Sequence, residues 1–80
     1  IVTLRCDNSL AGELYDRFGT DIILTREDET RFTAQLNVAA GDGFLAWVGQ
    51  WGARAEIIAP QDVRDAMRDR VAAAARLYCD

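Results

Sequence analysis

The chain has 80 residues, enough for one small domain, and it carries a net charge of −4 with no histidine. The negative charge argues against autonomous nucleic-acid binding, because an acidic surface repels a phosphate backbone at long range. The absence of histidine removes the commonest metal ligand and the usual general base near neutral pH. No apolar run approaches the roughly 20 residues of a membrane-spanning helix, so the sequence also argues against a membrane domain.

The first half of the chain predicts a strand, a helix and a hairpin. Residues 1–6 alternate between apolar and polar side chains, which is typical of a half-buried strand. Apolar residues then recur at helical spacing over 10–18, and Gly19 follows as a helix-terminating glycine. Residues 22–27 and 31–39 lie on either side of a polar "DET" tip, so we expect a hairpin there.

The second half predicts a short helix, a fourth strand and a longer helix. Large apolar residues at spacing i, i+3, i+4 and i+7 indicate the short helix, which Gly52 closes: Phe44, Trp47, Val48 and Trp51. We expect its two tryptophans to pack in the core rather than to stack on a ligand. Residues 53–59 read as a strand, and Pro60 suits the first position of the last helix, where a missing N–H is harmless.

This order of elements predicts an α+β fold. Its first six elements match a ferredoxin-like βαββαβ antiparallel sheet, and the last helix is additional. The two shorter helices would then cover one face of the sheet. The other face would be polar and would carry Thr3, Arg5, Thr33, Gln35, Asn37, Arg54 and Glu56.

The polar sheet face holds the first candidate contact site. Arg5 and Arg54 fall on strands that would be neighbours, and two adjacent guanidinium groups repel unless an anionic group lies between them. Glu56 can serve as that group within the domain. The functional alternative is an acidic partner or anionic effector, with Gln35 on the same face as a further contact.

The apolar stripe of the last helix is the second candidate. It consists of Val63, Met67, Val71, Ala74 and Tyr78. Since two other helices already cover one sheet face, this stripe must rest on a sheet edge, on the polar face or on another chain. Burial of unpartnered polar groups is unfavourable, so the polar face is a poor host. We therefore expect a two-fold homodimer with contacts at Val63, Met67, Val71 and Tyr78.

The sequence argues against catalysis, a metal and a cofactor. Cys6 and Cys79 do not form a C-x-x-C pair, and we expect both to be reduced. Ser9 has no visible base partner and is better read as a helix cap. An acylphosphatase-like enzyme would need a glycine-containing phosphate cradle after the first strand, and "CDNSL" has no glycine. We predict no catalytic residue.

The segment "FLAWVGQWGARAEIIAPQDVRDAMRDRVAAAARLY" resembles the WCX domain, the C-terminal extension of WYL-domain transcriptional regulators. That family shows a short helix with aromatic or aliphatic residues, a glycine, a strand, a proline, a Val/Leu-Arg pair and a helix that ends in tyrosine. The matching residues here are Trp47, Trp51, Gly52, Ala55 to Ile58, Pro60, Val63, Arg64 and Tyr78. Ala59 departs from the pattern, because relatives often carry serine or another capping residue before the proline.

The resemblance implies a role in a bacterial cytoplasmic regulator. Residues 1–80 would be a single WCX-like domain, a fragment of a longer chain with a helix-turn-helix and a WYL domain; the start at Ile1 fits this expectation. DNA would be bound only through the full-length protein, and this domain would be a non-catalytic regulatory and oligomerisation module. The alternative is a stand-alone ACT-like domain that binds a small molecule.

Overall fold

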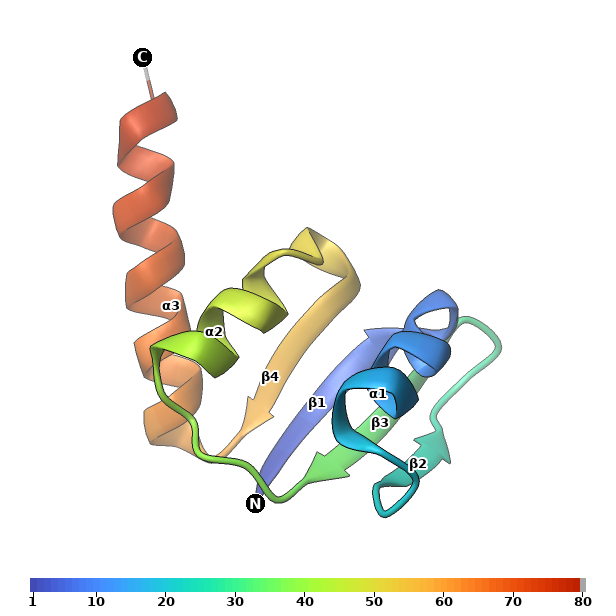
Figure 1. Cartoon of the computed structure of the whole chain (residues 1–80). Coiled ribbons are helices and arrows are strands. Elements are labelled where there is room, and N and C mark those ends of the chain that lie inside the picture. Colours follow the sequence, from blue (N-terminus) through green and yellow to red (C-terminus); the bar gives the residue numbers. More distant parts are fainter. Residues whose placement is uncertain (80) are drawn as a thin grey trace.

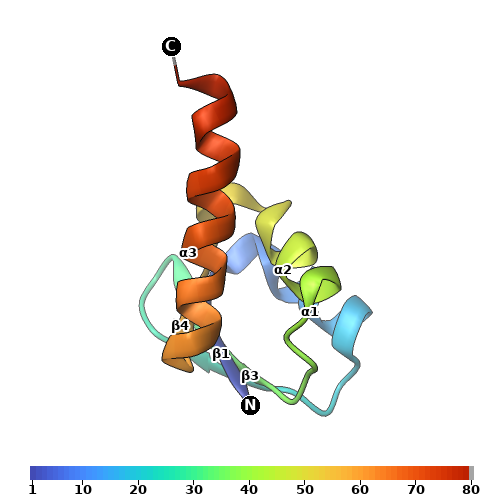
Figure 2. The same ribbon diagram turned by 90° about the vertical axis from the view of Figure 1, so that its left-hand side faces the viewer.

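The computed structural model describes residues 1–79 (Figure 1). The elements, in chain order, are β1 (Val2–Asp7), η1 (Asn8–Leu10), α1 (Ala11–Phe18), β2 (Ile23–Arg26), β3 (Arg31–Leu36), α2 (Asp42–Gly49), η2 (Gly52–Arg54), β4 (Ala55–Ala59), α3 (Gln61–Ala75) and η3 (Arg76–Tyr78). The η elements are single 3-10 turns. The four strands form one antiparallel sheet in the order β2-β3-β1-β4, and α1 and α2 lie on the same face of it (Figures 1 and 2).

The core lies between the sheet and these two helices. Alternate side chains of β1 and β3 are buried, as the period-2 pattern predicted, and the helices contribute the rest. The buried hydrophobic residues are Val2, Leu4, Cys6, Leu10, Leu14, Phe32, Ala34, Leu36, Phe44, Leu45, Val48 and Ile57. Burial raises the pKa of the Cys6 thiol to about 11, so Cys6 acts as a small apolar core residue.

The ends of the elements follow from local interactions. Gly19 ends α1 with a left-handed φ of 78°, and its N–H donates to the Tyr15 carbonyl oxygen at 2.8 Å. β3 ends at Leu36 rather than at Ala39, because Leu36 pairs with Val2, the first residue of β1, and no β1 residue remains to pair beyond it. The hairpin is therefore shorter than predicted, but its side chains lie on the predicted faces of the sheet.

The junction between α2 and β4 differs from the prediction. α2 ends at Gly49, three residues before the expected Gly52, which has a φ of 59° and begins the turn η2. Arg54 therefore lies in η2 and not in the fourth strand, which begins at Ala55. Pro60 precedes α3 as its N-cap rather than as its first residue, because its ψ of 167° is extended.

The α+β class, the antiparallel sheet and the additional C-terminal helix are confirmed. The plain ferredoxin-like βαββαβ pattern is not what the structure has. Turns η1 and η2 interrupt the connections into α1 and β4, β2 is only four residues long, and α3 adds a third helix beside β4.

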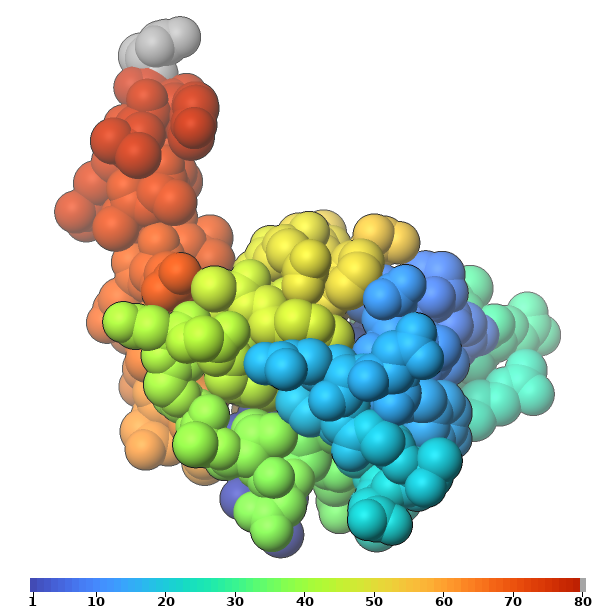
Figure 3. Space-filling view, viewed as in Figure 1, coloured from blue at the N-terminus to red at the C-terminus, as the bar shows by residue number. Residues whose placement is uncertain are grey.

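The two halves of α3 have different surroundings. Val63 and Met67 are partly buried against the core, whereas Val71 is 54 % exposed. Tyr78, in the turn η3 directly after α3, is 85 % exposed. Figures 1 and 2 show the C-terminal half standing clear of the sheet and of α2. The space-filling view in Figure 3 shows the same end projecting beyond the rest of the surface.

Candidate functional site

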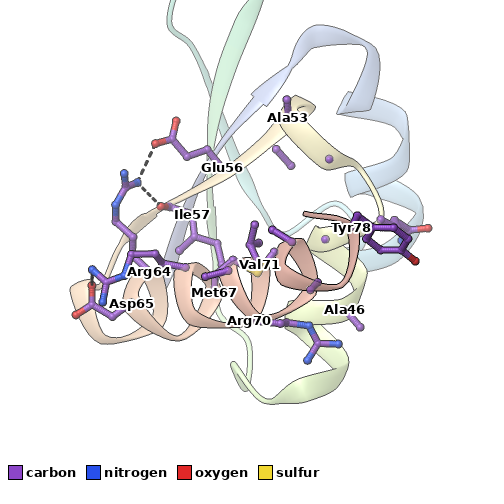
Figure 4. A pocket seen from close by; sticks show the side chains of 18 residues that line it. Ala46, Ala53, Glu56, Ile57, Arg64, Asp65, Met67, Arg70, Val71 and Tyr78 are labelled. Atoms are coloured by element: carbon purple, nitrogen blue, oxygen red, sulfur yellow. Dashed lines mark hydrogen bonds and ion pairs between the residues drawn. The ribbon is translucent and has the colours of Figure 1, made fainter. Parts of the chain in front are cut away.

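A groove of about 1210 Å³ lies between α3 and a wall formed by α2, η2 and β4 (Figure 4). The wall is made largely of residues with little or no side chain: Ala46, Gly49, Gly52, Ala53 and Ala55. The α3 side contributes mainly apolar side chains: Met67, Val71, Ala72, Ala74, Ala75 and Tyr78. Small residues on one wall and an apolar helix on the other make a surface that can accept a closely packed segment.

The side chains that α3 and the turn η3 contribute to the groove differ in exposure. Met67 is partly buried against the core, and its Cε would lie 3.5 Å from a Cβ atom built on Gly49, so it lies beside the end of α2. Toward the C-terminus, Val71 and Tyr78 are exposed. The exposed apolar surface of the groove therefore lies near its C-terminal end.

Arg64, near the start of α3, donates hydrogen bonds to the edge strand β4 (Figure 4). Its Nη1 donates to the Glu56 Oε2 at 2.8 Å and to the Ile57 carbonyl oxygen at 2.7 Å. The second bond satisfies a backbone carbonyl on the outer edge of β4, where no further strand pairs within the described residues. The Arg64 guanidinium, followed by Arg5, also holds the pKa of the Glu56 carboxyl below its ordinary value.

On the polar sheet face, Arg5 lies between two carboxylates. Its Nε donates to the Glu27 Oε2 at 2.7 Å, and its Nη1 donates to the Glu56 Oε1 at 3.3 Å. Glu27 is the main cause of the raised pKa of Arg5. Glu56 thus bridges Arg5 and Arg64, and not Arg5 and Arg54 as the sequence suggested.

Arg54 occupies a separate position near the start of β4. Its guanidinium carbon lies 5.4 Å from the centre of the Trp51 ring, and its Nη1 lies 3.4 Å from the Ser9 Oγ. Arg5, Arg54 and Glu56 nevertheless line one small pocket of about 170 Å³, together with Asp7, Thr30, Arg31 and Ala53. Gln35 does not join them: it pairs with Thr3 and Ile23 farther along the sheet.

The two tryptophans pack against the core, as predicted. The Trp47 and Phe18 rings meet edge to face with centroids 5.0 Å apart, and Trp47 and Trp51 do so at 5.9 Å. Both are partly buried and packed on the core cluster. This row joins α1 to α2 and supports the wall of the groove.

The residues of the predicted apolar stripe have two different environments in the structure. Val63 and Met67 are turned against the domain's own core, while Val71 and Tyr78 remain open in the groove. Sequence reasoning missed the wall residues that face the stripe. The signal was present in "GQWGA", where Gly49, Gly52 and Ala53 leave a surface without bulky side chains.

Two features are absent from residues 1–79: a metal-binding cluster and a membrane-spanning helix. No cluster of three or more histidine, cysteine, aspartate or glutamate side chains in this range could hold a metal ion. No helix in the same range is long and apolar enough to cross a membrane.

Comparison with known protein families gives a match over most of the chain. A family model described as the WCX domain matches residues 1–75, a range that includes all four strands and the whole of α1, α2 and α3. No curated protein and no solved structure matches the chain significantly. The matched range ends at the last residue of α3, just before η3.

Proposed function

The chain belongs to the WCX domain family, found C-terminal in WYL-type transcriptional regulators, and we propose that it is the non-catalytic regulatory and oligomerisation module of such a regulator. In this proposal the adjoining WYL and helix-turn-helix domains supply effector and DNA contacts in the cytoplasm. The domain itself contributes a surface that joins two copies.

The observation that carries the proposal is the open groove beside the C-terminal half of α3. Val71, Leu77 and Tyr78 are more than half exposed although all three are large and apolar. Large exposed apolar surfaces that adjoin a groove commonly mark sites of association. In a chain of 80 residues, additional burial at such a surface also adds to a small core.

The environment of the reactive groups supports a non-catalytic role. The Cys6 thiol is buried with a raised pKa, so little thiolate exists near neutral pH. The Ser9 hydroxyl donates to the Asp7 carboxylate, whose other contact with Ser9 is a helix-capping bond from the backbone N–H. Glu27 and Glu56 are engaged by arginines on a solvent-exposed face.

Sedimentation velocity over a concentration series tests the proposal. We expect a monomer–dimer equilibrium with the dimer dominant at high micromolar concentration. A chain that stays monomeric throughout this range would contradict the oligomerisation role. The catalytic part is tested separately with acyl phosphates: turnover by the pure chain that Arg5→Ala abolishes would contradict it.

A second candidate function is the binding of a small polar ligand in the 170 Å³ pocket. Arg54 makes no ion pair with a carboxylate in residues 1–79, whereas the neighbouring Arg5 makes two and Arg31 makes one. A guanidinium that has no carboxylate partner and lies in the same pocket as Asp7 suits a ligand with a carboxylate and an ammonium group, such as an amino acid. This is the ACT-like alternative.

Calorimetric titration with free amino acids distinguishes this candidate from the first. Binding that Arg54→Gln removes and Arg76→Gln retains would support the pocket. No heat of binding at millimolar amino acid would contradict it, and the oligomerisation proposal would be unaffected.

A further inference from the structure

The open half of α3 carries an apolar pattern that reads the same from both ends. The pattern consists of Val71, Ala74 and Ala75 of α3 and Tyr78 of the turn η3 that continues it, at positions i, i+3, i+4 and i+7. All four line the groove, and Figure 4 labels Val71 and Tyr78. The larger side chains are at the two ends and the two alanines are in the middle. Reversal of the direction of the helix exchanges Val71 with Tyr78 and Ala74 with Ala75.

We propose that this face binds the same face of a second copy, with the two α3 helices antiparallel about a two-fold axis between residues 74 and 75. Each Tyr78 then packs on the partner's Val71, and each Ala74 faces the partner's Ala75. The inference rests on the proposed oligomerisation role and names its surface. A two-fold contact requires a self-complementary patch, and this spacing supplies one.

Side-chain size favours the antiparallel arrangement. The central alanines allow the helix axes to approach closely, since interaxial distance depends on the side chains at the contact. The larger residues flank this centre and fill the space on either side. In a parallel pair, Tyr78 would instead oppose the partner's Tyr78, and Val71 would oppose the partner's Val71, so the contact would be crowded at one end and loose at the other.

Charge complementarity points the same way. From Val71 to Cys79 the sole charged residue is Arg76, and it does not line the groove. The antiparallel pairing brings the C-terminal end of each helix, with its negative dipole, toward the partner's Arg68 and Arg70, which do line the groove. Cations beside a helix C-terminus are stabilising, because they interact favourably with the helix dipole.

Burial of the first half of α3 limits the contact to the second half. Val63 and Met67 already pack against the core of their own chain, whereas Val71 and Tyr78 are exposed. In Figures 1 and 3 the C-terminal half of α3 stands apart from α2 and η2. A helix that enters there contacts the small wall residues Gly52 and Ala53 as well as α3, so both sides of the groove are covered.

Charge insertion at the centre tests the contact. Ala75→Glu places a carboxylate beside the proposed axis in both copies, and we expect the dimer dissociation constant to rise about tenfold or more in sedimentation equilibrium. Ala75 is exposed, so the monomer should keep its far-ultraviolet circular dichroism. Ala73→Glu is the matched control: it is the same change in the same exposed helix, at a residue that does not line the groove. Equal effects of the two variants would overturn the proposal.

A cross-link tests the antiparallel register itself. In a Cys79→Ser background, Val71→Cys with Tyr78→Cys should form a covalent dimer on oxidation. The two positions on one helix are about 10 Å apart along the axis, too far for a disulfide within one copy. Val71→Cys alone, in the same background, should cross-link much less.

The outcomes separate this inference from the proposed function. A dimer that sediments normally but does not cross-link would overturn the antiparallel α3 contact and leave the oligomerisation role standing. A wild-type chain that never dimerises would overturn both. Cross-linking by the double variant together with dissociation by Ala75→Glu supports both.

Discussion

The two halves of α3 share one apolar stripe and lie in opposite environments. In the first half, Val63 and Met67 pack against the core beside β4, and Arg64 donates to the edge of that strand. In the second half, Val71 and Tyr78 have the same helical spacing but remain exposed. Periodicity therefore identifies the apolar side of a helix. The length of the neighbouring elements decides how much of that side the domain covers.

The largest difference between the two halves is expected when the same charge is placed in each. Met67→Asp should lower the free energy of unfolding by about 2–3 kcal/mol, since it removes a partly buried side chain and brings a carboxylate to the core. Val71→Asp should change it by less than about 0.5 kcal/mol, because this residue is largely exposed. Urea denaturation at a concentration below dimer formation measures both.

The reverse order of effects is expected in sedimentation. Val71→Asp should weaken the dimer even though it leaves the monomer stable. If Val71→Asp destabilises the monomer as much as Met67→Asp does, the distinction between the two halves is wrong.

A smaller effect is expected when the attachment of α3 to β4 is removed. Arg64→Ala deletes the hydrogen bonds to Glu56 and to the Ile57 carbonyl oxygen, and we expect a loss of about 1 kcal/mol. Arg68→Ala is the matched control on the same helix: its ion pairs with Asp65 and Asp69 are exposed, so a change near zero is expected. Equal losses in the two variants would show that the bond to β4 does not hold the first half in place.

The smallest effect concerns the hairpin tip, which serves as a reference region away from α3. The backbone N–H of Thr30, followed by the Thr30 hydroxyl and Arg31, lowers the pKa of Asp28 from 3.8 to about 2. Because the folded pKa is depressed, the stabilisation is present above the unfolded pKa and is lost as the pH falls from about 4 to 2.

Asp28→Asn should therefore flatten the acid limb of the stability profile and leave dimerisation unchanged. Thermal melts between pH 2 and pH 7, with sedimentation at neutral pH, check both parts. A change in dimer affinity would show that the tip is not independent of the α3 surface.

Much of the fold was predictable because each signal is local. Alternation placed Val2, Leu4 and Cys6 on the buried face, and Gly19 ends α1 as its position suggested. The family resemblance found in "WGARAEIIAP" and its surroundings is confirmed by the WCX match over residues 1–75. The boundary errors at β3 and at the start of β4 came from pairing partners and a tight turn, neither of which has a periodic signature.

The candidate sites were less predictable, because they depend on contacts between distant residues. Strand phase predicts that Arg5 and Arg54 are neighbours, but Arg54 lies in η2 and not in the strand. Glu56 instead accepts a hydrogen bond from Arg64 of α3. Gln35 shares the polar face and still lies apart from the pocket, since register along the sheet separates them.

The period of each element, the apolar side of each helix and the likeness to the WCX family can be read from the amino-acid sequence. Those features depend on residues a few positions apart, where side-chain spacing and backbone preference decide the outcome. The extent to which the domain covers α3 depends instead on contacts between distant residues. Val63 and Met67 pack against the core, whereas the stripe beyond them stays exposed, because no other element of the described chain covers Val71 and Tyr78.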